Sequence, residues 1–127
     1  MQLQVTAIML GVADVERSKR FYRALGGRVV QDHPGFARLE LGEGSSALAL
    51  YPWDAAAQDA GVPPEGSGFR GASFHHIVGS KEEVDEIVGS ATAAGGTITK
   101  HPEGTDWGYS GFFSDPDGYL WKVATGG

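Results

Sequence analysis

The chain has 127 residues, a formal net charge of −6 and no cysteine. With 41% hydrophobic residues, this length suffices for one globular domain with a sizeable core. The acidic balance argues against nucleic acid and anionic membranes as partners, and the lack of cysteine excludes disulfides, thiolate nucleophiles and cysteine metal sites. The N-terminus shows no leader-like pattern and no stretch is apolar enough to span a membrane, so we expect a soluble, cytoplasmic protein.

The chain begins with a predicted strand and helix. Residues 5–12 form a short apolar run typical of a buried strand, in which Met9 shares one face with Ala7 and Gly11. Asp14 is a suitable N-cap for a helix that ends at the glycine pair after Leu25. The basic residues of this helix are expected to lie in solvent: Arg17, Lys19, Arg20 and Arg23.

Three more strands and a connector complete the first half. The strands are expected at residues 28–30, 36–41 and 47–51, where apolar and β-branched residues lie between glycine and proline turns. Residues 54–71 are rich in Ala, Gly, Pro and Asp, with room for one or two helical turns near the start. We therefore interpret them as a connector between two halves.

The second half repeats this order. Residues 72–78 predict a strand, and Ser80 with Glu83 has the spacing of a capping box at the start of a helix. A strand is expected at residues 97–100. The helix has the clearest periodic pattern in the chain, an apolar i, i+3, i+4, i+7 series of Val84, Ile87, Val88 and Ala91.

The chain closes with a predicted β-hairpin. Its turn is Asp115-Pro116-Asp117-Gly118, in which proline fixes φ, the aspartates can bond nearby amides and glycine tolerates a positive φ. Strand alternation then puts Lys122 alone among uncharged neighbours on one face and Trp121 on the other. We expect Trp121 and one phenylalanine of the preceding strand to belong to the core.

The two halves form an internal repeat of strand, helix and three strands. The best local match aligns residues 24–29 with residues 93–98. A sheet of this kind buries one face under its helix and needs a partner for the other face. We therefore predict an α+β fold in which two βαβββ modules form curved mixed sheets around a central cleft. The single domain 1–127 would comprise module one at 1–53, the connector at 54–71 and module two at 72–127.

The repeat, the Asp14 helix entry with Phe21-Tyr22, and the closing G-F-F-S-D-P-D-G-Y-L-W together resemble the vicinal oxygen chelate superfamily. That group includes glyoxalase I, bleomycin-resistance proteins and extradiol dioxygenases, and the resemblance covers essentially the whole chain. The run from Trp107 to Trp121 looks most like the small glyoxalase/bleomycin-resistance proteins of this group.

The resemblance implies a divalent metal held by residues on the first and last strands of each module, usually His, Glu or Gln. Carried over to this chain, those positions fall on Ala7, Ala49, Ser73 and Lys122. Two methyl groups, a hydroxyl and a cation are a poor donor set for a hard divalent ion. The first-strand positions leave a register of one or two residues open, whereas the turn fixes Lys122. We therefore expect no metal cofactor, the alternative being an ion such as Zn, Fe, Mn or Ni.

Several residues are candidates to contact a small ligand instead. His75 shares the face of Ser73, and its imidazole can donate and accept hydrogen bonds. Lys122 would place a positive charge beside an anionic or electron-rich ligand, or else extend to water. Trp107 and Tyr109 are expected in a loop before the hairpin, as parts of a pocket or lid. Met9 and Trp53 complete the predicted ligand-binding set.

The leading hypothesis is a metal-free protein that binds a small organic molecule, aromatic or antibiotic-like, as bleomycin-resistance proteins do. The first alternative is a glyoxalase-like lyase, isomerase or dioxygenase with a non-standard metal site that uses His75. The second is a scaffold or interaction module whose cleft is filled by its own side chains. We assign no catalytic residue, and we expect a homodimer because the resemblance implies one.

Overall fold

The structure is a computed structural model that describes residues 1–2, 4–66, 68–106 and 108–126. The chain divides into two compact units, Met1–Glu65 and Gly66–Gly127, and each is described by itself. Each unit holds one four-stranded sheet.

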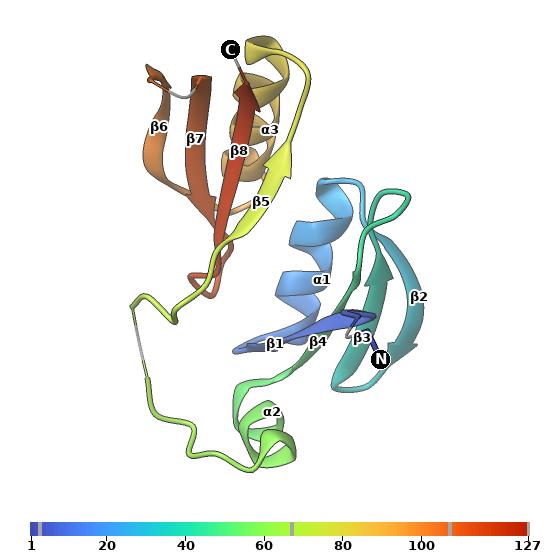
Figure 1. The fold of residues 1–127 in the computed structure, drawn as a ribbon. Coiled ribbons are helices and arrows are strands. Elements are labelled where there is room, and N and C mark those ends of the chain that lie inside the picture. The colour runs from blue at the N-terminus through green and yellow to red at the C-terminus, as the bar shows by residue number, and fades with distance from the viewer. Residues whose placement is uncertain (3, 67, 107, 127) are drawn as a thin grey trace. The chain divides into compact units, whose positions relative to one another are not determined.

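The first unit is a mixed sheet with one long helix along one face (Figure 1). The strand order is β1-β4-β3-β2, with β1 parallel to β4 and the other pairs antiparallel. Its elements are β1 (Ala7–Val12), α1 (Val15–Ala24), β2 (Arg28–His33), β3 (Phe36–Glu40), β4 (Ala47–Pro52) and α2 (Trp53–Ala60).

Helix α1 begins where the sequence predicts. The side chain of Asp14 accepts a hydrogen bond from the backbone amide of Arg17 at 3.1 Å, which satisfies one of the free amides of the first turn. Lys19 differs from the prediction, because it is buried rather than solvated. Its ammonium pairs with Glu16 and with Asp32, 2.9 Å away on β2, and these hydrogen bonds raise the pKa of Lys19. Lys19 is therefore buried because two carboxylates pair with its ammonium, and the pattern of α1 alone does not reveal the one on β2.

The core of the first unit lies between α1 and the sheet. Phe21 and Tyr22 of α1 are buried and meet edge to face. They face leucines of the sheet that are almost completely buried: Leu10, Leu39, Leu48 and Leu50. Burial of this apolar surface is the main stabilising term of the unit.

The second unit has the same topology. Its strand order is β5-β8-β7-β6, again with the first and last strands of the unit parallel and the other pairs antiparallel. The predicted internal repeat and the α+β fold with two βαβββ modules are confirmed. The elements are β5 (Phe74–Ile77), α3 (Lys81–Ala93), β6 (Thr97–Thr105), β7 (Gly108–Ser114) and β8 (Leu120–Gly126).

Helix α3 confirms both of its sequence signals. The Ser80 hydroxyl accepts from the Glu83 amide at 3.2 Å, which caps the helix. Val84, Val88 and Ala91 are buried, as the apolar spacing predicts. This helix covers the face of the sheet that carries Phe113 and Val123 (Figure 1).

The closing hairpin is built around a buried carboxylate. Asp115 is 2% exposed, and its Oδ1 accepts the backbone amides of Asp117 and Tyr119, each at 2.9 Å. The amide of Gly118 donates to the Asp115 carbonyl at 3.0 Å, and Gly118 has φ of +90°. The predicted turn chemistry is confirmed, since the aspartate bonds nearby amides and the glycine takes the left-handed conformation.

The largest difference in element bounds is in β6, which runs to Thr105 rather than ending at Lys100. Pro102 lies inside this strand because β6 is an edge strand and its register shifts between Lys100 and Glu103. A proline without an amide hydrogen is tolerated at such a place.

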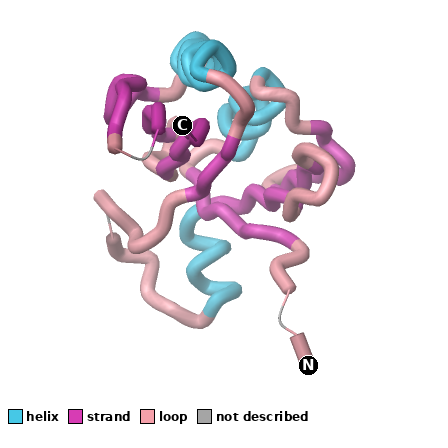
Figure 2. Tube along the Cα trace, turned by 45° about the horizontal axis from the view of Figure 1, so that its top comes forward, coloured by secondary structure: helices cyan, strands magenta, loops and turns pink. Residues whose placement is uncertain are grey.

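The segment between α2 and β5 contains neither helix nor strand in its described residues, as expected for a connector (Figure 2). The single helix predicted near its start is α2, which begins directly after β4. None of the described helices is long and apolar enough to cross a membrane.

Candidate functional site

Each sheet has one face that carries its long helix and an opposite face, here called the open face. On the first sheet, strand pairing places Ala49 between Met9 and Arg38, and Arg38 beside Gln31. Residues paired in this way point to the same side of a sheet. These four residues, called the first row, cross the open face of the first unit.

The second sheet carries an equivalent row. Strand pairing places Lys122 between His75 and Phe112, and Phe112 beside Lys100. These four residues are called the second row. Because the two sheets share one topology, Met9 corresponds to His75.

The second row and its surroundings join an imidazole, a cation and an aromatic ring. The Ser73 hydroxyl lies 3.0 Å from His75 Nε2, which confirms that these two residues share a face. The Lys122 ammonium lies 5.8 Å from the centre of the Phe112 ring, within cation–π range. His75 is exposed, and Lys122 and Phe112 are half-buried. This group can offer hydrogen bonds, a positive charge and a flat apolar surface to one ligand.

The open face of the first unit adds an aromatic strip. The Phe36 ring stacks on His33 at 6.5 Å between centroids and meets the Tyr51 ring edge to face at 6.1 Å. At the same end of β1, a side chain at Gly11 would meet the backbone of Trp53 at 3.3 Å. Helix α2 therefore packs close against this end of the strand.

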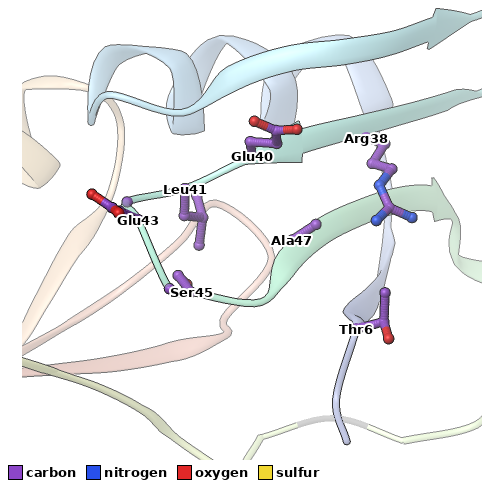
Figure 3. A pocket seen from close by; sticks show the side chains of 9 residues that line it. Thr6, Arg38, Glu40, Leu41, Glu43, Ser45 and Ala47 are labelled. Atoms are coloured by element: carbon purple, nitrogen blue, oxygen red, sulfur yellow. The ribbon is translucent and has the colours of Figure 1, made fainter.

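A pocket of about 270 Å³ lies at the other end of β1 and β4 (Figure 3). The Arg38 side chain extends past Ala47 toward Thr6, while Glu43 lies at the far end of the pocket. The remaining lining comes from β3 and the following loop: Glu40, Leu41, Gly42, Gly44 and Ser45. Glu40 is held in an ion pair with Arg28 of the neighbouring strand.

The predicted ligand-binding residues do not all share one face. Met9, His75 and Lys122 belong to the two rows, and Met9 is 43% exposed. Trp53 is the first residue of α2, and its indole nitrogen donates to the Pro64 carbonyl at 2.6 Å. A ligand contact by Trp53 stays a prediction.

Tyr109 lies in β7 rather than in the loop predicted before it. Its hydroxyl donates to Asp85 of α3 at 2.7 Å, so the side chain points to the helix side of the sheet, away from the face of Lys122. This hydrogen bond raises the pKa of Tyr109. The apparent loop is strand because β6 extends to Thr105 and pairs with β7. Trp107 lies outside the described residues.

Sequence reasoning assigned no role to Arg38, Phe36 or Tyr51. The signal for Arg38 was present, because alternation in F-A-R-L-E puts Arg38 opposite the buried Ala37 and Leu39. No sequence pattern predicts the aromatic strip, because Phe36 and Tyr51 lie on different strands whose pairing cannot be derived from the sequence. Phe113 is buried, which confirms one phenylalanine of β7 as a core residue. Trp121 stacks on it at 6.2 Å between centroids but is half-buried.

The fold and the repeat can be compared with known proteins. A family model described as the glyoxalase/bleomycin resistance protein/dioxygenase superfamily matches residues 4–123. The chain belongs to this superfamily. None of the curated proteins compared with it matches.

Solved structures of superfamily proteins agree with this assignment. The chain is 29% identical to a glyoxalase-related enzyme from Fulvimarina pelagi, with a TM-score of 0.84 over 98% of this chain and 88% of that one. A family enzyme from Burkholderia phytofirmans is 23% identical, with a TM-score of 0.84 over 97% and 98% of the two chains. A hypothetical protein from S. aureus is 22% identical, with a TM-score of 0.85 over 98% and 95%. The last two likenesses show the fold alone.

The superfamily's divalent metal can be tested against the residues of the open faces. The predicted ligand positions are Ala7, Ala49, Ser73 and Lys122, and the strand register now limits the alternatives. The strands that come first and last along the chain in each unit are β1, β4, β5 and β8. Their other open-face positions are Met9, Gly11, Ala47, Tyr51, His75, Ile77, Leu120 and Ala124.

These positions contain one imidazole, His75, and no carboxylate. Shifting the register by two residues therefore supplies no acidic ligand. Within the described residues, no group of three or more His, Asp or Glu side chains lies together as a metal site would require. Lys122 would repel a cation, so this side-chain set does not fit the metal of the superfamily.

Proposed function

We propose that this superfamily member binds a small organic molecule on the open face of its second unit without a divalent metal. The observation that best supports this proposal is the second row, in which Lys122 lies between His75 and Phe112. A cation stands where the resemblance implies a metal-binding side chain, so it can take over the attraction of an electron-rich ligand group. The Phe112 ring beside it supports a ligand that is aromatic or antibiotic-like.

The proposal is tested by a thermal-shift screen of small aromatic compounds in buffer containing EDTA. A compound that binds only the folded protein raises the midpoint of unfolding, and the rise grows with the logarithm of its concentration relative to its dissociation constant. At least one concentration-dependent rise is expected in the absence of metal. A screen in which rises appear only after a divalent ion is added would contradict the proposal.

Changing Lys122 to glutamate is expected to weaken a ligand found in this screen by about tenfold or more, because the variant replaces an attractive charge with a repulsive one. Isothermal titration calorimetry measures the change. Lys81→Glu is the matched control, since it makes the same charge change on α3, on the helix side of the same sheet. Equal losses in both variants would show that net charge, rather than the second row, controls binding.

The same variant also tests the metal assignment. Lys122→Glu supplies one carboxylate but leaves Ala49 and Ser73 unchanged, so we expect no tight binding of Zn²⁺, Mn²⁺ or Ni²⁺ in the titration. Tight binding created by this one change would mean that the other ligand positions are wrongly assigned.

A glyoxalase-like lyase, isomerase or dioxygenase is the second candidate function. The observation in its favour is the hydrogen bond between Ser73 and His75, which orients the imidazole beside Lys122. Elemental analysis of purified protein separates the candidates: a stoichiometric divalent metal that His75→Ala releases would favour the enzyme. We continue to expect that the protein is cytoplasmic and forms a homodimer.

A further inference from the structure

The open face of the first unit holds a cation, Arg38, that no described residue pairs with. Within the described residues, no hydrogen bond or ion pair engages the Arg38 guanidinium. Glu40, the acidic residue on the same face of β3, is occupied by Arg28. Arg38 is half-buried, and its guanidinium points into the pocket of Figure 3.

The surroundings of Arg38 are suited to an acid with an apolar body. Ala47 lines the pocket together with Arg38. Ala49 is paired with Arg38 on the sheet and lies next to Met9. Thr6 adds a hydroxyl at the pocket. A guanidinium can bind a carboxylate or a phosphate through two parallel hydrogen bonds, which makes arginine selective for such groups.

Each of the two rows carries positive charge, although the chain as a whole is acidic. The chain carries a net charge of −6, yet the two rows contain three cations, Arg38, Lys122 and Lys100, and no carboxylate. Acidic residues outnumber basic ones in this chain, so a random placement of charges would not favour cations in both rows. Their placement favours a ligand whose charge is opposite to theirs.

We propose that the first unit binds a small organic acid in this pocket and that Arg38 binds its oxyanion, a carboxylate or a phosphate. This inference goes beyond the proposed function, because it adds a second site with its ligand class and the residue that determines its specificity. The pocket volume of about 270 Å³ lies just below the range typical of drug-sized ligands, so it accommodates a small acid or the acidic end of a larger molecule.

The test is an amide NMR titration of the full ¹⁵N-labelled chain with benzoate, its neutral analogue benzamide, and phenyl phosphate. Benzoate or phenyl phosphate is expected to shift the amides of Gly42, Gly44 and Ala47 in the millimolar range, and benzamide is not. Whichever acid shifts them identifies the oxyanion. If neither acid does, or if benzamide binds equally well, the inference is wrong.

Arg38→Gln keeps a polar side chain but removes the charge and the guanidinium, so it is expected to weaken binding of the acid by about tenfold. Arg20→Gln, an exposed arginine of α1, makes the same change in net charge and should leave the affinity within about twofold. The amide spectrum of each variant also reports whether it is folded. Equal affinity for wild type and Arg38→Gln would overturn the assignment.

Glu43 provides a second measurement in the opposite direction. This carboxylate lies at the far end of the same pocket, so Glu43→Gln is expected to strengthen acid binding. If a ligand from the thermal-shift screen depends on Lys122 while neither acid shifts the amides of the pocket, the proposed function stands and this inference fails. If benzoate or phenyl phosphate binds at Arg38 while no compound in the screen depends on Lys122, the opposite conclusion holds.

Discussion

Replacing Asp115 with alanine is expected to lower the free energy of unfolding by about 3 kcal/mol, because two backbone amides lose their shared charged acceptor. The carboxylate is 2% exposed and accepts from Asp117 and Tyr119 inside the closing turn. Water cannot reach these amides as freely as it would at the surface, so the lost bonds are not replaced. Urea-induced unfolding followed by circular dichroism measures the effect.

Two further variants give this prediction its control. Asp115→Asn keeps an oxygen that can accept both amides and should recover more than half of the lost stability. Asp59→Ala, at an exposed position of α2, should change stability by less than about 0.5 kcal/mol. An Asp115→Ala protein as stable as the Asp59→Ala protein would contradict the role given to the carboxylate.

Two glycines are expected to respond to alanine with opposite signs. A Cβ at Gly111 would lie 2.9 Å from Cγ and 3.0 Å from the backbone nitrogen of Pro102. Because backbone atoms of β6 cannot move aside cheaply, we expect Gly111→Ala to cost about 1–3 kcal/mol. Gly89 lies in α3 with open space around it, so Gly89→Ala should stabilise the protein by about 0.5–1 kcal/mol.

The same urea titration measures both glycine variants. A loss of stability at Gly89 as well would contradict the open space around that residue, and a gain in both variants would mean that contact with Pro102 does not limit Gly111. No loss at Gly111 would mean that β6 and β7 are farther apart than their pairing indicates.

The sequence predicts the features that depend on neighbouring residues. The closing turn, the Asp14 and Ser80 caps and the apolar side of α3 are all confirmed, because each is determined by residues within four positions of one another. The repeat of these local patterns was then enough to give the α+β fold and its superfamily.

Features that depend on strand pairing are less predictable. The helix pattern predicts that Lys19 lies in solvent. Its burial depends on the ion pair with Asp32 of β2, which the helix pattern does not include. Tyr109 appears to precede a hairpin, and only the pairing of β6 with β7 places it in a strand. Arg38 lies beside Ala49 only because β3 pairs with β4, and the two residues are 11 positions apart in the chain.

The central claim is that a small ligand binds this superfamily member without a divalent metal. Calorimetric titration of the strongest compound from the thermal-shift screen, with and without EDTA, tests it most directly. We predict the same dissociation constant in both buffers within about twofold, because the two rows supply cations and aromatic carbon rather than metal ligands. Binding that is lost in EDTA and restored by a stoichiometric divalent ion would contradict the claim.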